Sequence, residues 1–200
     1  MRFRATPLAG AFVVEIEPHN DARGFFARTW CEREFRNQGL AGELVQASIS
    51  RNEKRGTVRG MHLQLPPSHE AKLVRVQRGA IYDVIIDLRP RSATYLKHFG
   101  VELSSRLSNA LYIPPQFAHG FQTIEDDSEV LYQMTDFHAP ELAYGFRWND
   151  PAFNIDWPLR AGITIAERDA GYPDFSRADY ESRLSRADEP GQPPPARTGG

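Results

Sequence analysis

The stretch Lys72-Leu-Val-Arg-Val-Gln-Arg-Gly-Ala-Ile-Tyr-Asp-Val-Ile-Ile-Asp-Leu88 contains two runs rich in valine and isoleucine on either side of Arg78-Gly79. β-Branched residues favour extended strands, and a glycine between two such runs favours a tight turn. We therefore expect strands over Lys72–Arg78 and Ala80–Leu88, joined as a hairpin.

Runs of the same kind extend in both directions from this stretch, with turn residues between them. The best helix candidate is the charged segment Glu32–Gln38, which ends before a glycine. Many short strands at a spacing of roughly 8–12 residues indicate an all-β sandwich or barrel. The further runs cover Ala11–Ile16, Gly24–Thr29, Leu44–Ser50, Thr57–Leu63, Phe99–Leu103, Ala110–Ile113, Gly120–Ile124 and Glu129–Thr135.

The composition fits one globular domain followed by a tail. With 200 residues, of which 40% are hydrophobic and 11% aromatic, the chain can bury a core of its own. We place the domain at residues 1–184. From Ser185 onward proline, glycine and polar residues dominate, so we expect residues 185–200 to be disordered.

Charge and cysteine content argue against several classes of function. The net charge of −2 gives no basic surface for nucleic acid, and no apolar run approaches the ~20 residues that cross a membrane. No continuous apolar segment follows the charged start Met1–Ala5, so we do not expect a secretory signal. The single cysteine, Cys31, leaves no intrachain disulfide and no cysteine-rich zinc site, and it favours the reducing cytoplasm.

The best candidate for chemistry is His62, together with a lysine on what we expect to be the neighbouring strand. His62 lies in Arg59-Gly-Met-His-Leu-Gln64. The two-residue period of a strand puts Gln64 on the same side, in a shared pocket. Arg59 falls on the opposite side unless Gly60 introduces a bulge.

The lysine in question is Lys72, one of only three lysines among 24 basic residues. On its strand Arg75 has the opposite parity, so the two need not share a face. A lone strand lysine is often a solvated charge, and a lone histidine is usually structural. Together, however, a base and a compact cation can take a proton from carbon beside a carbonyl and stabilise the enolate.

Three further clusters carry polar side chains. In Ile113-Pro-Pro-Gln-Phe-Ala-His-Gly-Phe121 the prolines stop one strand and His119 opens the next, where it could touch a ligand. Tyr132 could face the barrel interior, although a buried tyrosine more often serves packing. Asp169 could orient an imidazole, or it could be an ordinary surface acid.

In this order the clusters resemble the dTDP-4-dehydrorhamnose 3,5-epimerase family of cupin-like jelly rolls. The resemblance runs from Asp21-Ala-Arg-Gly-Phe-Phe26 to Asp169. It includes the Arg-Gly-Met-His-Leu-Gln, Ala-Lys-Leu-Val-Arg-Val, Phe-Ala-His-Gly-Phe and Trp148-Asn-Asp-Pro151 segments. It implies an all-β, cupin-like jelly roll with a few short helices. It also implies an epimerase that acts at C3, C5 or both of a nucleotide-linked 4-keto-6-deoxyhexose, with no metal or other cofactor.

The resemblance also implies a role for each matching residue. His62 corresponds to the base, and Asp169 to the carboxylate that fixes its tautomer. Lys72 corresponds to the cation at the enolate oxygen, and Tyr132 to the phenol that returns a proton from the opposite face. In the family, N-terminal strands pair between subunits, so the segment Phe12–Thr29 implies a homodimer.

Several positions depart from the family's usual pattern, mostly where the nucleotide is recognised. Arg28 and Ala143 each replace a glutamate, His138 replaces a stacking tyrosine, and Arg168 replaces a lysine; Gln46-Ala-Ser48 replaces Gln-Asp-Asn. These departures leave the reaction type unchanged and predict looser or altered recognition of the base. The substrate-binding residues that we expect are Arg23, Arg28, Gln46, Ser48, Arg59, Gln64, His119, His138 and Arg168.

Other functions are compatible with the same fold. A metal-dependent cupin needs His-x-His on one strand, but this strand reads His62-Leu-Gln64, so His69 or Glu70 would have to supply a ligand. A non-catalytic sugar-nucleotide-binding jelly roll would not need the proton-transfer residues together. One enolate chemistry serves both carbons, so an epimerase of a single carbon, or of another nucleotide sugar, is the nearest alternative.

Overall fold

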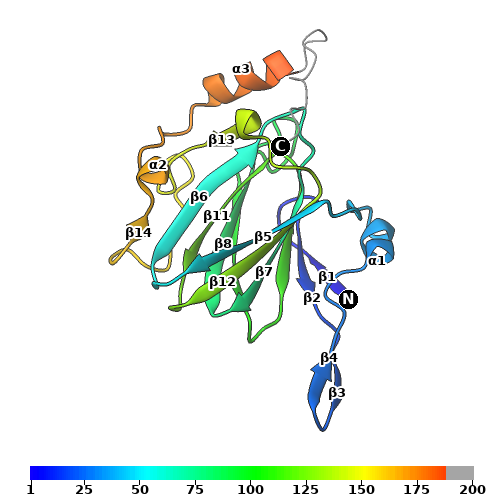
Figure 1. Cartoon of the computed structure of the whole chain (residues 1–200). Coiled ribbons are helices and arrows are strands. Elements are labelled where there is room, and N and C mark those ends of the chain that lie inside the picture. The colour runs from blue at the N-terminus through cyan, green and yellow to red at the C-terminus, as the bar shows by residue number, and fades with distance from the viewer. Residues whose placement is uncertain (188–200) are drawn as a thin grey trace, which may run out of the picture.

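The computed structural model describes residues 1–187, which form two antiparallel sheets packed face to face (Figure 1). The first sheet has the order β1-β2-β10-β7-β12-β5, with bounds β1 (Arg2–Ala5), β2 (Phe12–Glu15), β10 (Ala110–Ile113), β7 (Lys72–Arg78), β12 (Ser128–Met134) and β5 (Gln46–Asn52). The second has the order β13-β6-β11-β8-β9, with bounds β13 (Ala143–Gly145), β6 (Thr57–Gln64), β11 (Phe117–Thr123), β8 (Ala80–Asp87) and β9 (His98–Ser104). β14 (Thr164–Ile165) adds to β6 in parallel.

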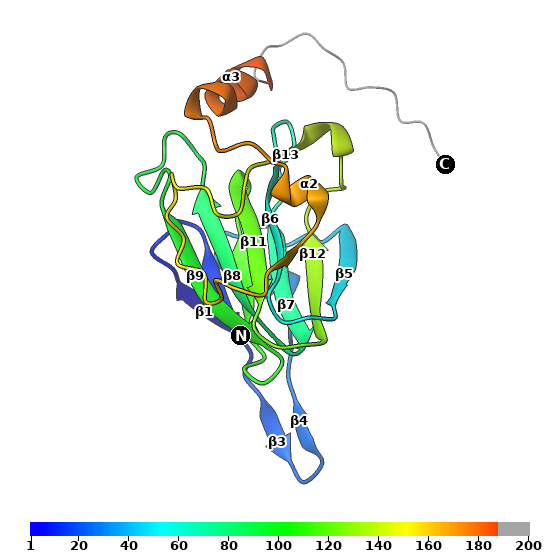
Figure 2. The same ribbon diagram turned by 90° about the vertical axis from the view of Figure 1, so that its left-hand side faces the viewer.

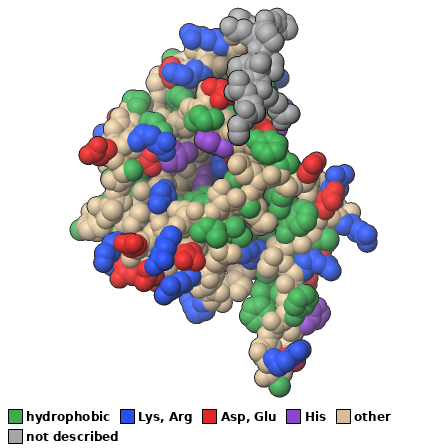
Figure 3. Space-filling view, viewed as in Figure 1, with side chains coloured by type: hydrophobic (Ala, Val, Ile, Leu, Met, Phe, Trp, Pro, Cys, Tyr) green, Lys and Arg blue, Asp and Glu red, His purple; other side chains and the backbone are tan. Residues whose placement is uncertain are grey.

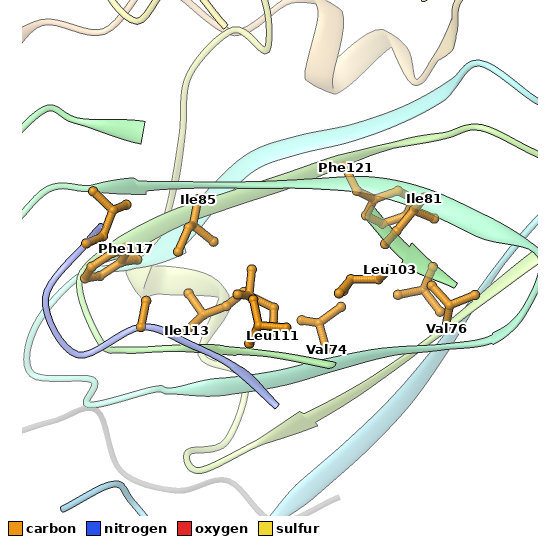
Figure 4. Close-up of a cluster of buried hydrophobic side chains, with 13 residues drawn as sticks. Val74, Val76, Ile81, Ile85, Leu103, Leu111, Ile113, Phe117 and Phe121 are labelled. Carbon is orange, nitrogen blue, oxygen red and sulfur yellow. The ribbon is translucent and has the colours of Figure 1, made fainter. Parts of the chain in front are cut away.

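Alternating side chains on the facing strands build the core between the sheets. On β7, Val74 and Val76 point inward, and on β8, Ile81 and Ile85 meet them from the other sheet. Figure 4 shows these residues as one buried cluster between the two layers. Burial of such apolar side chains is the main stabilising contribution to the fold. The all-β class expected from the strand pattern is therefore confirmed.

The outer faces of both sheets are covered by shorter elements (Figures 1 and 2). Helix α1 (Glu32–Asn37) packs Phe35 against the first sheet. The C-terminal segment covers the second sheet, where Phe153, Trp157 and Tyr180 are buried. It contains α2 (Glu167–Ala170) and α3 (Arg177–Ala187), and a 3₁₀ turn, η1 (Pro140–Leu142), precedes β13. Of the described helices, none is long and apolar enough to cross a membrane.

The expected hairpin at Arg78-Gly79 is wrong. β7 pairs with β10 and β12, whereas β8 pairs with β9 and β11, so Gly79 turns the chain from one sheet into the other. Gly79 has a φ of +73°, and a Cβ there would lie 2.5 Å from the hydroxyl of Ser128. A tight glycine turn suits a hairpin and a crossover equally, so the local sequence does not separate them.

Two other expectations need correction. β6 and β7 also lie in different sheets, so His62 and Lys72 face each other across the barrel rather than lying on neighbouring strands. His119 lies in the middle of β11 and is buried, not at a strand mouth, because that strand begins at Phe117.

The C-terminal helix extends beyond residue 184, where we expected the domain to end. α3 continues to Ala187, so residues 185–187 are helical. The rest of the expected tail, residues 188–200, lies outside the described residues.

A two-stranded hairpin projects away from the barrel (Figures 1 and 2). Its strands, β3 (His19–Asp21) and β4 (Gly24–Phe26), pair only with each other among the described strands. Phe25 and Phe26 on this hairpin are exposed, Phe26 to 79%. Two large apolar side chains on a projecting element are unusual for a surface that faces only water.

Candidate active site

One end of the space between the sheets is polar and open. Here the inner face carries histidine, lysine, arginine and tyrosine in place of the aliphatic core, and the cavity has a volume of about 600 Å³. Figure 3 shows histidine side chains gathered around a hollow on this face of the molecule. A cavity of this size suits a small-molecule ligand. Its lining residues are Ser48, Ile49, Ser50, Arg59, His62, Lys72, His119, Phe121, Tyr132, His138, Ala166, Arg168 and Asp169.

These groups face the cavity because alternate residues of each strand point inward. Lys72 shares the inward face of β7 with Val74 and Val76, and Tyr132 shares that of β12 with Val130. Arg75 points to the opposite face, where its guanidinium donates hydrogen bonds to the carbonyl oxygens of Thr29 and Ser108 at 3.0 Å. The expected separation of Lys72 from Arg75 is therefore confirmed.

An irregularity in β6 brings Arg59 and His62 to the same side. His62 pairs with His119 on β11, but Arg59 pairs with Phe121, so three residue steps on β6 match two on β11. Gly60 sits at this point with a φ of +126°, and a Cβ there would lie 2.5 Å from the Cα of Gly120. Only glycine allows so close an approach of the two backbones. The bulge that would return Arg59 to the cavity is confirmed.

His62 forms a dyad with Asp169, although the two residues are 107 positions apart. His62 Nε2 lies 3.0 Å from Asp169 Oδ1, and Asp169 Oδ2 accepts a hydrogen bond from the backbone N–H of Gly60 at 3.2 Å. Only 5% of the Asp169 side chain is exposed. Burial by itself raises the pKa of this carboxyl. The hydrogen bond and charge of His62, together with the hydrogen-bond donors of Gly60 and Arg168, outweigh the effect of burial, so the pKa is lowered overall. Asp169 is therefore an ionised partner for the imidazole at neutral pH.

A second histidine–aspartate pair lies deeper in the cavity. His119 Nε2 is 2.7 Å from Asp83 Oδ1, and both side chains are buried. Burial raises the pKa of Asp83, and the neighbouring His119 only partly offsets that rise. Asp83 Oδ2 has no hydrogen-bond partner among the described residues. The ring of Tyr132 packs edge-on against His119, with ring centroids 5.9 Å apart.

These surroundings keep Tyr132 protonated. Burial raises the pKa of its phenol far above the ordinary value, and the charge of Asp83 raises it further against an opposing effect of Arg59. At neutral pH the phenol therefore carries its proton, which suits a donor.

Lys72 is held by an acidic neighbour in the loop that leads into β7. Its Nζ lies 2.6 Å from Glu70 Oε2, and both side chains are largely buried. An ammonium has three N–H donors, so the ion pair leaves two of them for a ligand in the cavity. The arrangement as a whole offers a base on one sheet and a cation and a phenol on the other.

A family model described as dTDP-4-dehydrorhamnose 3,5-epimerase matches residues 5–177 of the chain. The chain belongs to this family. The dTDP-4-dehydrorhamnose 3,5-epimerase of Methanothermobacter thermautotrophicus is 41% identical to it over 173 residues, which cover 86% of this chain and 92% of that protein.

Solved structures give the same result. The crystal structure of dTDP-4-dehydrorhamnose 3,5-epimerase from Elizabethkingia anophelis NUHP1 superposes with a TM-score of 0.85 at 34% identity, covering 88% of this chain and 96% of that one. A dTDP-6-deoxy-D-glucose-3,5-epimerase from Legionella pneumophila, solved in complex with dTDP-4-keto-L-rhamnose, gives 0.81 at 30% identity, with 86% and 92% covered. The cupin-like jelly roll and the epimerase class expected from the sequence are confirmed.

Most of the residues that the family resemblance singled out line the cavity of this epimerase. All four proton-transfer candidates do so, and so do five of the substrate-binding candidates, Ser48, Arg59, His119, His138 and Arg168. Arg168 is mostly exposed, and its Nε lies 3.3 Å from Asp169 Oδ1.

Two of the expected residues lie far from the cavity of their own chain. Arg23 is on the projecting hairpin, 89% exposed and paired with Asp21. Arg28 pairs with Glu34 beside α1, at 2.9 Å, and lines a separate surface groove. Both residues lie in the segment Phe12–Thr29, which the resemblance placed at a contact between subunits, and that contact stays a prediction.

Two further expected residues act behind the cavity wall. Gln64 donates to the hydroxyl of Ser68 and to the carbonyl of Phe137, and it accepts from the N–H of Ala139 at 2.6 Å. Gln46 accepts from the N–H of His138 at 3.0 Å. The pocket that we expected His62 and Gln64 to share is therefore wrong, because the Gln64 amide is used to fix the segment that carries His138. Gln46 binds the same segment.

Sequence reasoning did not identify three residues that hold the cavity side chains in place. Asp83 is a charged residue in an otherwise apolar strand, and it has the same parity as the inward-facing Ile81 and Ile85. This pattern could have predicted an aspartate that points into the interior. Glu70 lies two positions before Lys72, and it was considered only as a metal ligand. Asn52 accepts a hydrogen bond from Arg59 Nε at 2.8 Å, and no sequence pattern pointed to it.

Residues 1–187 contain no group of three or more histidine, cysteine, aspartate or glutamate side chains arranged to hold a metal ion. His69, considered as a substitute ligand, is exposed, and its backbone N–H bonds to Asp136. Glu70 is taken up by the ion pair with Lys72. The donor set of the alternative metal-dependent cupin is therefore not assembled in this part of the chain.

Proposed function

We propose that this epimerase converts dTDP-4-dehydro-6-deoxy-D-glucose to dTDP-4-dehydro-L-rhamnose by inverting C3 and C5. The family of the chain and the relative solved with dTDP-4-keto-L-rhamnose support this substrate. The observation that carries the mechanism is the placement of His62 on one sheet, bonded to Asp169 of α2, opposite Tyr132 on the other sheet.

In the proposed reaction His62 removes a proton from the carbon beside the C4 ketone. The electron pair of the broken C–H bond moves onto the ketone oxygen, and the ammonium of Lys72 stabilises the enolate oxygen formed there. Asp169 stabilises the imidazolium and holds the proton of neutral His62 on Nε2, which leaves Nδ1 as the base.

Inversion requires the new proton to arrive from the other face of the sugar. Tyr132 lies on the sheet opposite His62 and carries its proton, so we assign it this step. The carbon takes the phenolic proton, the enolate collapses to the ketone, and solvent restores the proton on Tyr132 and removes the one on His62. Protons balance over the cycle and no electrons leave the substrate.

Deuterium uptake tests this proposal. In deuterated water the enzyme should place deuterium at C3 and C5 of the substrate, and His62→Ala should lower the initial rate by at least ~10²-fold. His69→Ala is a matched control, because His69 is exposed and outside the cavity. If His62→Ala exchanged label at the rate of His69→Ala, the assignment of the base would fail.

The position of the label also tests the nearest alternative. Label at both carbons supports a 3,5-epimerase, whereas label and inversion at a single carbon would identify an epimerase of that carbon alone. A protein that binds the nucleotide sugar without any exchange would have to be a non-catalytic binding jelly roll.

The remaining cavity residues are assigned to substrate binding. Arg59 is held by Asn52 through Nε, and its two terminal NH₂ groups have no hydrogen-bond partner among the described residues, so they can meet the diphosphate as a bidentate donor. His119, Ser48, His138 and Arg168 line the same cavity and complete the proposed binding set. The cytoplasmic location expected from the sequence stays a prediction.

We further propose that the enzyme is a homodimer in which the projecting hairpin docks on the second copy. The hairpin exposes Phe25 and Phe26 and carries Arg23, which is not among the described residues that line the cavity of its own chain. β5 is an edge strand, and its exposed Ile49 lines the cavity, so an apolar partner fits there.

Mixing two inactive variants tests this arrangement. Arg23→Ala and His62→Ala should each be impaired as homodimers. After subunit exchange, each mixed dimer holds one site with an intact His62 and an Arg23 supplied from the partner, so about a quarter of the wild-type sites should return. A monomer by light scattering with full activity, or no recovery on mixing, would overturn the proposal.

A further inference from the structure

The imidazole of His62 has a second neighbour besides Asp169. The ring of Tyr172 packs edge-on against it, with ring centroids 5.8 Å apart and an interplanar angle of 68°. Aromatic rings prefer such edge-to-face contacts at centroid separations of about 4.5–7 Å. Tyr172 comes only three residues after Asp169, so one short segment brings both groups to the base.

The two neighbours restrain different motions of the imidazole. Nε2 lies close to the axis about which the ring turns on its Cβ–Cγ bond, so the hydrogen bond to Asp169 limits the tilt of the ring only weakly. The corresponding torsion of histidine is broad in any case. An aromatic ring packed against the imidazole resists that tilt directly, because turning His62 would drive it into Tyr172.

The position of Tyr172 is built into the sheet. Gly145 pairs with His62 between β13 and β6, and a Cβ on Gly145 would lie 2.6 Å from Cζ of Tyr172. The missing side chain therefore makes the space that the tyrosine ring occupies. The carbonyl of the next residue, Pro173, accepts a hydrogen bond from the N–H of Arg147 at 3.1 Å, which ties the segment to the chain that follows β13.

Tyr172 also separates the cavity from a second surface groove. That groove has a volume of about 410 Å³ and is lined by Tyr172, Tyr144 and Gly145, among others, but not by His62. His62 lines the cavity, and Tyr172 does not. The tyrosine ring is therefore a wall between the base and the groove.

We propose that Tyr172 is a positioning residue that holds the imidazole of His62 in its productive orientation. It contacts neither the substrate nor the reacting atoms, and it acts through the packing of its ring rather than through its hydroxyl. The inference rests on the role of His62 proposed above.

Three substitutions at this position test the proposal. The energy of one edge-to-face contact is enough to favour the productive orientation of the His62 ring over other orientations by roughly three- to tenfold. Tyr172→Ala and Tyr172→Leu should therefore lower kcat by about that factor and leave KM within about twofold. Tyr172→Phe keeps the ring and should keep kcat within about twofold of wild type.

Tyr144→Ala is the matched control. Tyr144 is a tyrosine of the same groove, next to Gly145, but its ring packs against Tyr180, 5.7 Å away, and not against His62. It should lower the melting temperature without changing kcat. The ¹⁵N spectrum of histidine-labelled protein, with the His62 signals identified by their loss in His62→Ala, should change in Tyr172→Ala and not in Tyr144→Ala.

The outcomes separate this inference from the proposed function. If Tyr172→Ala and Tyr172→Leu both retained kcat within twofold of wild type, or if Tyr172→Phe lost as much as they did, the inference would fail while the base assignment stood. An active His62→Ala would remove the base assignment itself, whatever the tyrosine variants did.

Discussion

Replacing Asp169 by asparagine isolates the charge of the dyad, because the side chain keeps its size. In the structure Oδ1 faces His62 Nε2 and Oδ2 accepts the N–H of Gly60. An amide has one oxygen, so it satisfies only one of these partners as an acceptor. If the oxygen stays on Gly60, the amide nitrogen donates to Nε2 and the proton of His62 moves to Nδ1, the nitrogen that must act as base.

The magnitude follows from the lost interaction. A hydrogen bond to a charged group is worth about 1.5–3 kcal/mol, and each 1.36 kcal/mol is tenfold in rate. Asp169→Asn should therefore lower kcat by about 10- to 150-fold. The loss of ~10⁴-fold for the equivalent change in serine proteases, where the tautomer is also wrong, marks the upper end.

The assay is the initial rate of deuterium uptake at C3 and C5 of the keto sugar, followed by proton NMR from pH 5 to 8. The lowered pKa of Asp169 keeps the carboxylate ionised over this range, so the loss should be present throughout it. Asp150→Asn is the control, because Asp150 is a buried carboxylate in the same C-terminal part of the chain that does not touch His62. Equal rates for the two variants would refute the dyad.

The same carboxylate gives a prediction for stability. Its folded-state pKa lies below the unfolded value of ~3.9, so its contribution is fully present above that value and is lost as the pH falls through the folded pKa. The difference in free energy of unfolding between wild type and Asp169→Asn should therefore be constant at neutral pH and shrink in acid. A difference that grew below ~3.9 would contradict the sign of the shift.

Three further substitutions and one competition assay test the other groups. Tyr132→Phe should keep deuterium exchange with retention of configuration while most inverted product is lost, and a normal rate of inversion would mean that another group delivers the proton. Lys72→Ala should depress both exchange and inversion, and Lys72→Arg should not restore them fully, because a guanidinium is larger and flatter than an ammonium. Competition by dTDP, UDP, CDP and GDP should show weak discrimination between bases, since His138 offers a small stacking face; a strong preference for dTDP would contradict this.

Most of the site could be predicted because strand parity is a strict rule. Once β7 is known to carry Val74 and Val76 inward, Lys72 must point inward and Arg75 outward, and the structure agrees. The bulge at Gly60 could be anticipated for the same reason, since Arg59 otherwise has the wrong parity.

The errors arose where local sequence carries no information about long-range partners. Gly79 signals a turn, but only the pairing of whole strands decides whether that turn closes a hairpin or crosses between sheets. Gln64 has the correct parity for the cavity, yet backbone groups of a loop more than 70 residues away use its amide. Tyr172 sits outside every motif, and its contact with His62 depends on the space left by Gly145.

The seven residues of β7 connect the interior chemistry with the exterior of the molecule. Its inner face supplies Lys72 to the cavity, while on its outer face Arg75 binds the carbonyl of Thr29, three residues after the end of the projecting hairpin. The guanidinium is buried without a carboxylate partner among the described hydrogen bonds, so its only compensation is this attachment to backbone oxygens. Through Arg75, the strand that carries the catalytic lysine is therefore anchored to the segment from which the hairpin projects.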